Sequence, residues 1–298
     1  METAKKAEEV EEEVPLEARP LLRVDWPPTF PQCFFHVPWR GSTDVPCCLA
    51  AHDLYPIAKN EMLVDLRESV RAARQIIDEL HDERVFEQIG AYIRSGRETK
   101  VLAPVKLPEV NSNALGVVYA QAVASVFGFE VEGNIFQVTA EKRDRKLDSL
   151  YRLALPPIFR GAIKPGVDYI LVDDVFTTGG TLAGLRGYIH RQGGNVVVCS
   201  TIAAGQRVTQ QATRYDQRQM GVALAPTSDR IRALRNTLGE EYRAVDSVFC
   251  EGLRYGLQQL TEQEARFVSS QARTIRGYRG SISEWFAGKI LDARSSGT

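Results

Sequence analysis

One segment constrains the fold of this chain more than any other. An apolar run at residues 169–172 leads without a break into two aspartates and then a short loop of threonines and glycines. Because the run is apolar throughout rather than alternating, it predicts a strand buried on both faces, as in a parallel sheet. Residues 182–191 follow with a helical pattern. This order predicts an α/β fold with polar residues at the carboxyl edge of the sheet, where such folds bind ligands.

Strand and helix patterns alternate along the segment that we expect to form the core, residues 61–205. Strand–helix alternation of this kind predicts a parallel sheet with helices on its faces. The helical spacing at residues 61–93 contains one break, so two helices are expected there. The other expected elements are strands at 100–105, 129–138 and 195–202, and a helix at 113–127.

The two ends of the chain differ from this core. Residues 1–20 are rich in glutamate and poor in apolar side chains, which predicts a disordered acidic tail. Residues 21–60 hold dense prolines and frequent aromatics without periodicity, so we expect an irregular segment over the core. Residues 206–298 are expected to be mostly helical, as a hood over the sheet or a partner surface. Capping-box patterns predict helices at 262–273 and 283–291.

Composition narrows the class of protein. The 37 basic and 38 acidic residues give a net charge of −1, which provides no global footprint for nucleic acid. No apolar run reaches membrane-spanning length, and the amino terminus is acidic, unlike a signal peptide. Five cysteines at irregular spacing do not suggest a secreted disulfide scaffold. We therefore expect a cytoplasmic protein without a membrane partner.

The loop after the two aspartates has the composition of a phosphate site. Its small residues let backbone N–H groups converge on one point, and the following helix adds the positive end of its dipole. Carboxylates repel a phosphate, so Asp173 and Asp174 suit sugar hydroxyls or a divalent cation carried by a more negative group. The pattern predicts a ligand with a terminal phosphate, a ribose and a metal-bound anion. The alternative is an ordinary strand–turn–helix with a solvated acidic strand end.

Residues 170–181 closely resemble the phosphoribosyl pyrophosphate (PRPP) signature of type I phosphoribosyltransferases, which has apolar residues, two acids, two apolar residues and a Thr/Ser/Gly loop. The resemblance implies a type I phosphoribosyltransferase-like parallel sheet flanked by helices, with a helical C-terminal region. It also implies that Asp173 and Asp174 hold the ribose 2′- and 3′-hydroxyls. The 5′-phosphate would lie in the loop formed by Thr177, Thr178, Gly179, Gly180 and Thr181.

Pyrophosphate requires its own anchor, which the family places in the loop after the first core strand. Here Lys106 is the cation of that loop, and Ser112 or Asn113 would cap the next helix. The match is loose, because residues 107–109 are Leu-Pro-Glu where many family members have small residues or glycines. An ordinary strand–helix connection with a solvated lysine is the alternative.

Residues 140–147 are highly charged and lie where the family places a mobile lid. Arg143 is the candidate there to meet pyrophosphate, because a closing lid excludes water and supplies charge as the leaving group departs. A solvated loop with balanced charges is the alternative. The order of parts over residues 100–200 also looks like the ComF-like branch of the family.

The resemblance implies transfer of 5-phosphoribose from PRPP, with Mg²⁺ on the pyrophosphate, to a nucleobase or related nitrogen acceptor. The bond to pyrophosphate breaks ahead of the new bond, which gives C1 oxocarbenium character. Thr177 stands where purine-salvage members often carry an acid that assists proton transfer, so an acceptor needing little such help is favoured. Two alternatives stay open: a PRPP- or nucleotide-binding regulator without turnover, and an effector whose C-terminal helices bind a protein partner or a second copy.

A separate set of residues near the amino terminus has spacings that could bind zinc. The pairs are Cys33 with His36 and Cys48 with His52, and some ComF-like proteins carry an amino-terminal zinc module. Buried cysteines and histidines are nevertheless common in aromatic-rich segments. We therefore expect packed side chains here and assign no metal site to the chain itself.

Overall fold

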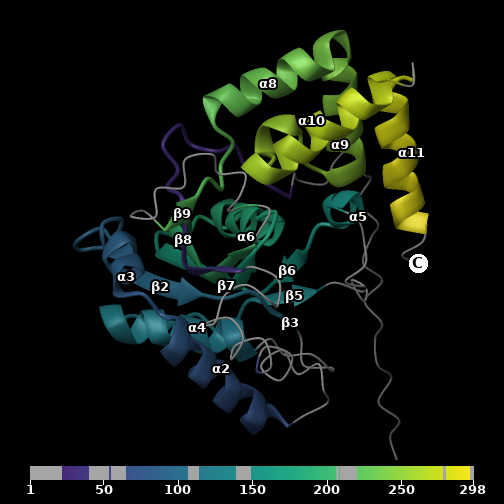
Figure 1. The fold of residues 1–298 in the computed structure, drawn as a ribbon. Helices are drawn as coiled ribbons and strands as arrows, with labels where there is room; N and C mark the ends of the chain where they lie inside the picture. Colours follow the sequence, from purple (N-terminus) through teal and green to yellow (C-terminus); the bar gives the residue numbers. More distant parts are fainter. Residues whose placement is uncertain are drawn as a thin grey trace, which may run out of the picture.

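The described strands form a central sheet of six strands, in the order β4-β2-β7-β8-β1-β9 (Figure 1). This computed structural model describes residues 22–39, 54, 65–106, 114–138, 149–205, 208, 220–277 and 280–295. Neighbouring strands run parallel except for β9, which pairs antiparallel with β1. The predicted α/β fold is confirmed. The strands are β1 (Cys33–Trp39), β2 (Thr99–Leu102), β4 (Glu130–Val131), β7 (Asp168–Phe176), β8 (Asn195–Gly205) and β9 (Gly221–Val222).

Helices cover both faces of this sheet (Figure 1). On one face lie α2 (Leu66–Leu80), α3 (Glu83–Gly90) and α4 (Ala114–Phe127); on the other lies α6 (Gly180–Arg191). The predicted pair of helices within residues 61–93 is confirmed, since α2 and α3 are separated by only two residues. Each of the two begins with an aspartate N-cap, Asp65 for α2 and Asp82 for α3, and Asp82 lies at the expected break.

A smaller sheet of three strands lies beside the carboxyl end of β2. It contains β3 (Val105–Lys106), β5 (Phe136–Val138) and β6 (Ile158–Arg160). β3 runs parallel to β5, whereas β6 runs antiparallel to it. The prediction of a strand or a pair of strands within residues 129–138 is confirmed by β4 and β5.

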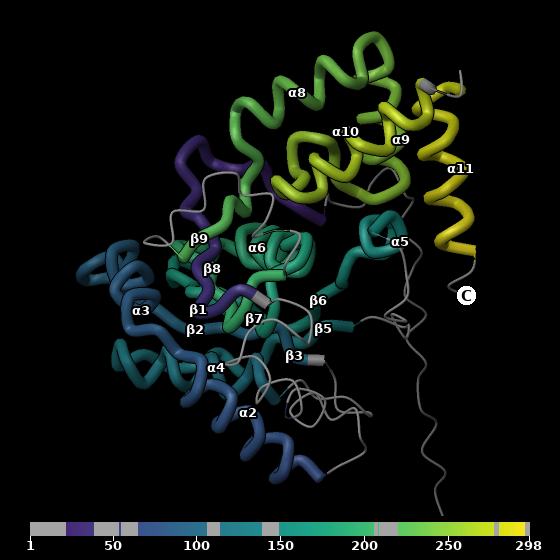
Figure 2. The backbone as a smooth tube through the Cα atoms, viewed as in Figure 1, coloured from purple at the N-terminus to yellow at the C-terminus, as the bar shows by residue number. Residues whose placement is uncertain are grey.

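The C-terminal part of the chain is helical, as predicted, and has a hydrophobic core of its own. Its helices lie beyond α6 on the side away from the sheet (Figure 2). Among the described helices, none has the length and hydropathy needed to cross a membrane. The elements that share this second core are α5 (Ser149–Ala154), α8 (Ser228–Leu238), α9 (Tyr242–Leu253), α10 (Glu262–Gly277) and α11 (Ile282–Ser295).

One prediction about the amino-terminal segment is wrong. Residues 21–60 were expected to be irregular, but Cys33–Trp39 forms β1, which pairs in parallel with β8 inside the sheet. The run is short and includes Pro38, yet its three aromatic residues and one valine suit a strand. The predicted acidic tail at residues 1–20 lies outside the described residues.

Two elements cross the boundary expected at residue 205. The helix α5 comes from the predicted core segment but contributes Leu150 and Leu153 to the C-terminal cluster. Conversely, β9 comes from the predicted helical region and extends the sheet. The two hydrophobic cores are therefore built from interleaved parts of the chain rather than from consecutive halves.

Candidate functional site

The predicted site lies where β7 ends and α6 begins. β7 continues to Phe176, four residues past the apolar run that predicted it, so both aspartates lie within the strand. Asp173 is half-buried, while Asp174 is 6% exposed. Since successive side chains of a strand point to opposite faces, the two aspartates leave β7 on opposite sides.

Backbone contacts orient both carboxylates. Asp173 Oδ1 accepts a hydrogen bond from the N–H of Asp174 at 2.9 Å, and Asp174 Oδ1 accepts one from the N–H of Val175 at 2.6 Å. Each carboxylate is thus turned along the strand toward its carboxyl end. The proposal that both hold one ribose diol stays a prediction.

The loop at residues 177–181 connects the strand to the helix through a left-handed glycine. Gly179 has φ of 76° and occupies the N-cap position of α6 without offering a side-chain cap. The first N–H groups of a helix have no intrahelical acceptor. Among the described residues, only Thr178 Oγ1 serves here, accepting from Gly180 N–H at 3.4 Å. The start of α6 can therefore donate to an anion.

The carbonyl side of this loop contacts the C-terminal helices. Thr261, which precedes α10, donates its hydroxyl to the carbonyl oxygen of Thr178 at 2.5 Å. Arg23 Nη2 lies 3.5 Å from the carbonyl oxygen of Gly180. A Cβ placed on Gly180 would lie 2.8 Å from Glu264 Oε1. The 177–181 loop is therefore enclosed from one side by residues far away in the sequence.

A buried ion pair stands directly behind the loop. Arg23 and Glu264 form hydrogen bonds of 2.6 and 2.9 Å, and their side chains are 2% and 5% exposed. The guanidinium also lies 3.9 Å from the centre of the Tyr255 ring. Burial by itself lowers the pKa of Arg23, but the charge and hydrogen bond of Glu264 together with Tyr255 outweigh it and hold that pKa above its ordinary value.

Sequence reasoning did not identify Arg23 or the role of Glu264. The capping-box pattern of Thr261 and Glu264 was visible and is confirmed, because each backbone N–H donates to the other side chain, at 2.9 and 3.1 Å. No sequence signal connected that box to the 177–181 loop, which lies 83 residues away at Thr178.

Of the two cations predicted to bind pyrophosphate, the structure describes Lys106 but not Arg143. Lys106 is the second residue of β3, where its backbone pairs with Gln137 of β5. Ser112, Asn113 and Arg143 lie outside the described residues, as do the 107–113 connection and the predicted lid at 140–147. Their proposed roles stay predictions.

The structure accounts for His36 without a metal. The N–H of Asp82 donates to His36 Nδ1 at 2.7 Å, so the ring proton lies on Nε2, which donates to the Tyr119 hydroxyl at 2.9 Å. That hydroxyl lies 2.6 Å from Ser200 Oγ, which donates to the carbonyl oxygen of Phe34 at 3.0 Å. Burial lowers the pKa of His36 to about 4. Both ring nitrogens are therefore occupied, and the side chain is neutral.

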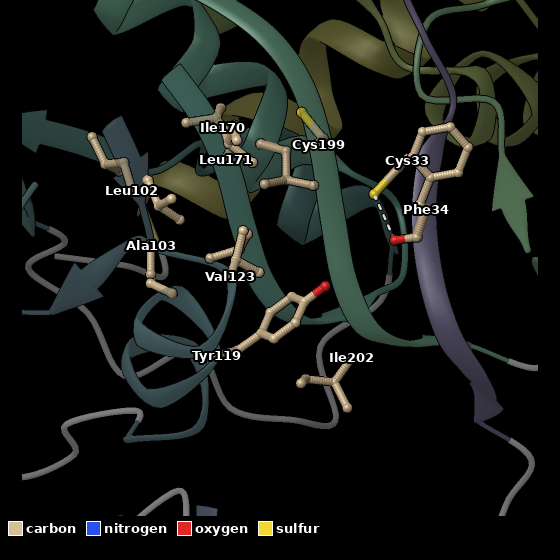
Figure 3. Close-up of a cluster of buried hydrophobic side chains, with 14 of the residues drawn as sticks. Cys33, Phe34, Leu102, Ala103, Tyr119, Val123, Ile170, Leu171, Cys199 and Ile202 are labelled. Atoms are coloured by element: carbon tan, nitrogen blue, oxygen red, sulfur yellow. Dashed lines mark hydrogen bonds between the residues drawn. The ribbon is translucent and has the colours of Figure 1, made fainter. Parts of the chain in front are cut away.

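Cys33 cannot join His36 at a metal. The two residues are three positions apart on β1, so their side chains leave opposite faces of the strand. Burial raises the pKa of the Cys33 thiol well above its ordinary value, and the side chain packs in the apolar core near Cys199 (Figure 3). In the described part of the chain no three His, Cys, Asp or Glu side chains cluster as a metal site. Cys48 and His52 lie outside that part.

A cavity of about 520 Å³ lies elsewhere, between the amino-terminal segment and the loop before α8. None of the predicted site residues that the structure describes lines it. Its walls present about as much polar as apolar surface, and the apolar residues among them include Trp26, Phe30, Leu224, Pro226 and Ile231. Arg186 lies over Trp26 and Phe30, with its guanidinium carbon 4.6 and 5.2 Å from the two ring centres.

Comparison with known sequences finds partial relatives. No family model matches the chain. The chain is 32% identical over 196 residues to protein TraN of Escherichia coli, covering 65% of this chain and 39% of that protein. It is 27% identical over 172 residues to an uncharacterized protein of Haemophilus influenzae, covering 57% and 35%. The chain thus spans well under half the length of these curated relatives.

Phosphoribosyltransferases occur among the more distant similarities. A stretch of 66 residues is 39% identical to an adenine phosphoribosyltransferase of Nitrosospira multiformis, covering 22% of this chain and 38% of that enzyme. Similar solved structures include adenine phosphoribosyltransferases of Leishmania tarentolae (17% identity, TM-score 0.27, 50% and 67% coverage) and Rhodothermus marinus (18%, 0.30, 50% and 75%). TM-scores this low do not place the chain in that family. It is an α/β protein with a mostly parallel sheet and a helical C-terminal region.

Proposed function

We propose that this protein binds PRPP at the carboxyl end of β7 and transfers its 5-phosphoribose to a nitrogen acceptor with release of pyrophosphate. One observation carries the proposal. The 177–181 loop joins a central parallel strand to the start of α6, with aspartates immediately before it and helix-start N–H groups available. A ligand that combines a phosphate with a sugar diol matches both halves of this arrangement.

The phosphate end of the ligand suits the loop for electrostatic reasons. The start of α6 carries the positive end of the helix dipole and N–H donors without intrahelical acceptors. Small residues let the backbone approach an anion closely, and Gly179 adopts the left-handed conformation that the turn requires. A terminal phosphate would receive several N–H donors at this point.

The sugar end of the ligand suits the aspartates. Carboxylates accept hydrogen bonds from hydroxyl groups, and both aspartates lie near the end of β7. Their oxygens also suit a hard cation such as Mg²⁺, but the described residues offer no cluster of three acidic, His or Cys side chains to hold one. This favours a cation that arrives on the pyrophosphate of PRPP. Bound there, Mg²⁺ neutralises charge on the leaving group.

The chain's own residues would act mainly by positioning. The loop and the aspartates would fix the phosphate and the ribose, which leaves C1 of the sugar to face the acceptor in a defined geometry. Lys106 and Arg143 are proposed to stabilise pyrophosphate as its charge develops. Thr177 has no carboxylate that could take up a proton. The nitrogen that receives the phosphoribosyl group should therefore need little help in losing its proton.

A second function is favoured by the burial of one aspartate. Asp174 is 6% exposed and its Oδ1 already accepts from Val175, which limits its access to a ligand diol. Asp173 would then hold the diol largely alone, and the sugar would be fixed less tightly for displacement at C1. Together with the missing acid at Thr177, this favours a regulator that binds PRPP or a nucleotide without turnover. Enzyme and regulator share the binding step and differ in pyrophosphate release.

The test measures thermal stabilisation by Mg²⁺-PRPP. Wild type should melt at a higher temperature with ligand, and the double variant Asp173→Asn with Asp174→Asn should lose that shift while each asparagine keeps an oxygen for its backbone partner. Asp78→Asn with Asp229→Asn, two exposed acids away from the loop, is the control with the same change in charge. Equal shifts in wild type and the Asp173/Asp174 variant would contradict the proposal.

Pyrophosphate release then separates the two functions. Purified protein with Mg²⁺-PRPP is incubated with a panel of free bases and related nitrogen compounds. Release with one acceptor supports the transferase. Tight binding of PRPP with no release across the panel supports the regulator.

A further inference from the structure

We infer that the C-terminal helices position the 177–181 loop, and that Thr261 is the positioning residue that fixes its peptide groups. The inference rests on the proposed function only for the identity of the ligand, a phosphate ester. The contacts that carry it lie on the side of the loop facing α10, away from the helix-start N–H groups.

The orientation argument follows from trans peptide geometry. In a trans peptide the C=O and the next N–H point in opposite directions. The carbonyl of Thr178 accepts from Thr261 at 2.5 Å and that of Gly180 from Arg23 at 3.5 Å. The N–H groups of Gly179 and Thr181 therefore point away from α10, toward the open side of the loop. Without the hydroxyl of Thr261, the peptide group between Thr178 and Gly179 loses the contact that fixes its direction.

The hydroxyl of Thr261 is itself locked in place. Thr261 is fully buried, and its Oγ1 accepts from the N–H of Glu264 at 3.1 Å, so its proton is directed to Thr178. The Glu264 carboxylate accepts a hydrogen bond from the N–H of Thr261 at 2.9 Å, and it also accepts one from Arg23. Because Thr261, Glu264 and Arg23 are all buried, the donor has one orientation rather than several.

The loop cannot fix this orientation alone. Its N-cap position is a left-handed glycine without a side chain, and the contact of Gly180 N–H with Thr178 Oγ1 does not hold the carbonyl of Thr178. The following glycine is required by the contact: a Cβ at Gly180 would lie 2.8 Å from Glu264 Oε1 and 3.3 Å from Arg23 Nη2. The close approach of α10 thus explains a glycine of the loop independently of any ligand.

Thr261 acts through the loop rather than on the ligand, because it lies on the carbonyl side. One hydrogen bond of this kind contributes on the order of a fivefold to tenfold change in an equilibrium. Thr261→Val, which keeps the shape and removes the hydroxyl, should weaken binding of ribose 5-phosphate roughly fivefold to tenfold. Thr261→Ser keeps the hydroxyl and should restore wild-type affinity.

The sequence allows the peptide group between Thr178 and Gly179 to be observed directly by isotope labelling. Thr178 and Gly179 form the one Thr-Gly pair in the chain. Protein labelled with carbonyl-¹³C threonine and ¹⁵N glycine therefore gives a single carbonyl–amide cross-peak, from this peptide group. In ligand-free protein we expect the peak to move or broaden in Thr261→Val and to keep its position in Thr261→Ser.

A matched control separates loop positioning from loss of a helix cap. Ser281 caps α11 by accepting from Glu284 N–H at 3.3 Å and donates to Glu241, so Ser281→Ala loses the same kinds of contact far from the loop. The cross-peak and the affinity for ribose 5-phosphate should be unchanged in Ser281→Ala. Should Thr261→Val fail to fold, Thr261→Ala takes its place with the same expectation.

The outcomes distinguish this inference from the proposed function. If wild type binds neither ribose 5-phosphate nor PRPP, the proposed function fails, and the ligand-free cross-peak still decides the inference. An unchanged cross-peak in folded Thr261→Val or Thr261→Ala overturns the positioning role whatever the ligand data. A shifted cross-peak that also appears in Ser281→Ala overturns it as well, because the effect would then be general.

Discussion

The 177–181 loop follows β7 and the Cys33–His36 pair lies on β1, two strands of the same sheet, and each region holds side chains capable of chemistry. At His36 every polar atom has a partner inside the protein, and the chain of contacts ends on a backbone carbonyl. At the loop, the described partners hold the carbonyls and leave most helix-start N–H groups available. The difference teaches that position along a strand, more than residue type, separates a candidate site from a packed core.

The largest effect is expected from breaking the buried ion pair behind the 177–181 loop. Glu264→Gln leaves the buried Arg23 guanidinium without its carboxylate, which should cost about 3–5 kcal/mol of unfolding free energy. Chemical denaturation at pH 7 measures this change in the free energy of unfolding. Replacing both partners, as Arg23→Met with Glu264→Leu, should recover much of the loss because no unpaired charge remains. A Glu264→Gln variant as stable as wild type would show that the pair is not needed.

The next effect concerns the packed pair on β1. The pKa of His36 is lowered from 6.5 to about 4, so between these values the unfolded chain binds a proton that the folded chain does not. Stability therefore falls as pH decreases through this window, by about 2 kcal/mol from pH 7 to pH 5 for this group. His36→Gln should remove that part of the slope in denaturation at both pH values.

Another histidine provides a comparison for the pH experiment. Burial also lowers the pKa of His190 to about 4, so His190→Gln should remove a separate part of the slope. A slope unchanged by His36→Gln would mean that the histidine is not held neutral as its contacts indicate.

A smaller effect tests the turn itself. Gly179→Ala should cost about 1–2 kcal/mol for the left-handed backbone alone. Gly166 has nearly the same φ, 77° against 76°, but a Cβ there would meet nothing within 4 Å, so Gly166→Ala is the control for backbone strain. At Gly179 the Cβ would lie 2.5 Å from Leu224 Cδ1, so the loss should be larger there. Equal losses in the two variants would show that packing does not constrain the turn.

Much of the fold could be predicted from the sequence, because apolar runs and helical spacing report burial directly. The strand before the loop, the helices on both faces and the capping box at Thr261 followed from local patterns. The strand at Cys33–Trp39 was missed because seven residues that include a proline carry too little periodicity to distinguish the run from a loop. The burial of Asp174 was missed because nothing local indicated that β7 continues past the acids.

The candidate site could be located but not completed from sequence. The loop was visible in consecutive residues, whereas Arg23 and Glu264 are 241 positions apart and meet only in the folded chain. Cation–carboxylate pairs over such distances have no sequence signature. The support of the loop by α10 is therefore a property of the tertiary structure alone.

The most direct test of the account observes the peptide group between Thr178 and Gly179 while ligand is added. With the single carbonyl–amide cross-peak assigned, titration with Mg²⁺-PRPP and with ribose 5-phosphate should move the peak in a saturable manner, whereas ribose without phosphate should not. A cross-peak that stays in place at saturating Mg²⁺-PRPP would contradict the claim that this loop receives a sugar phosphate.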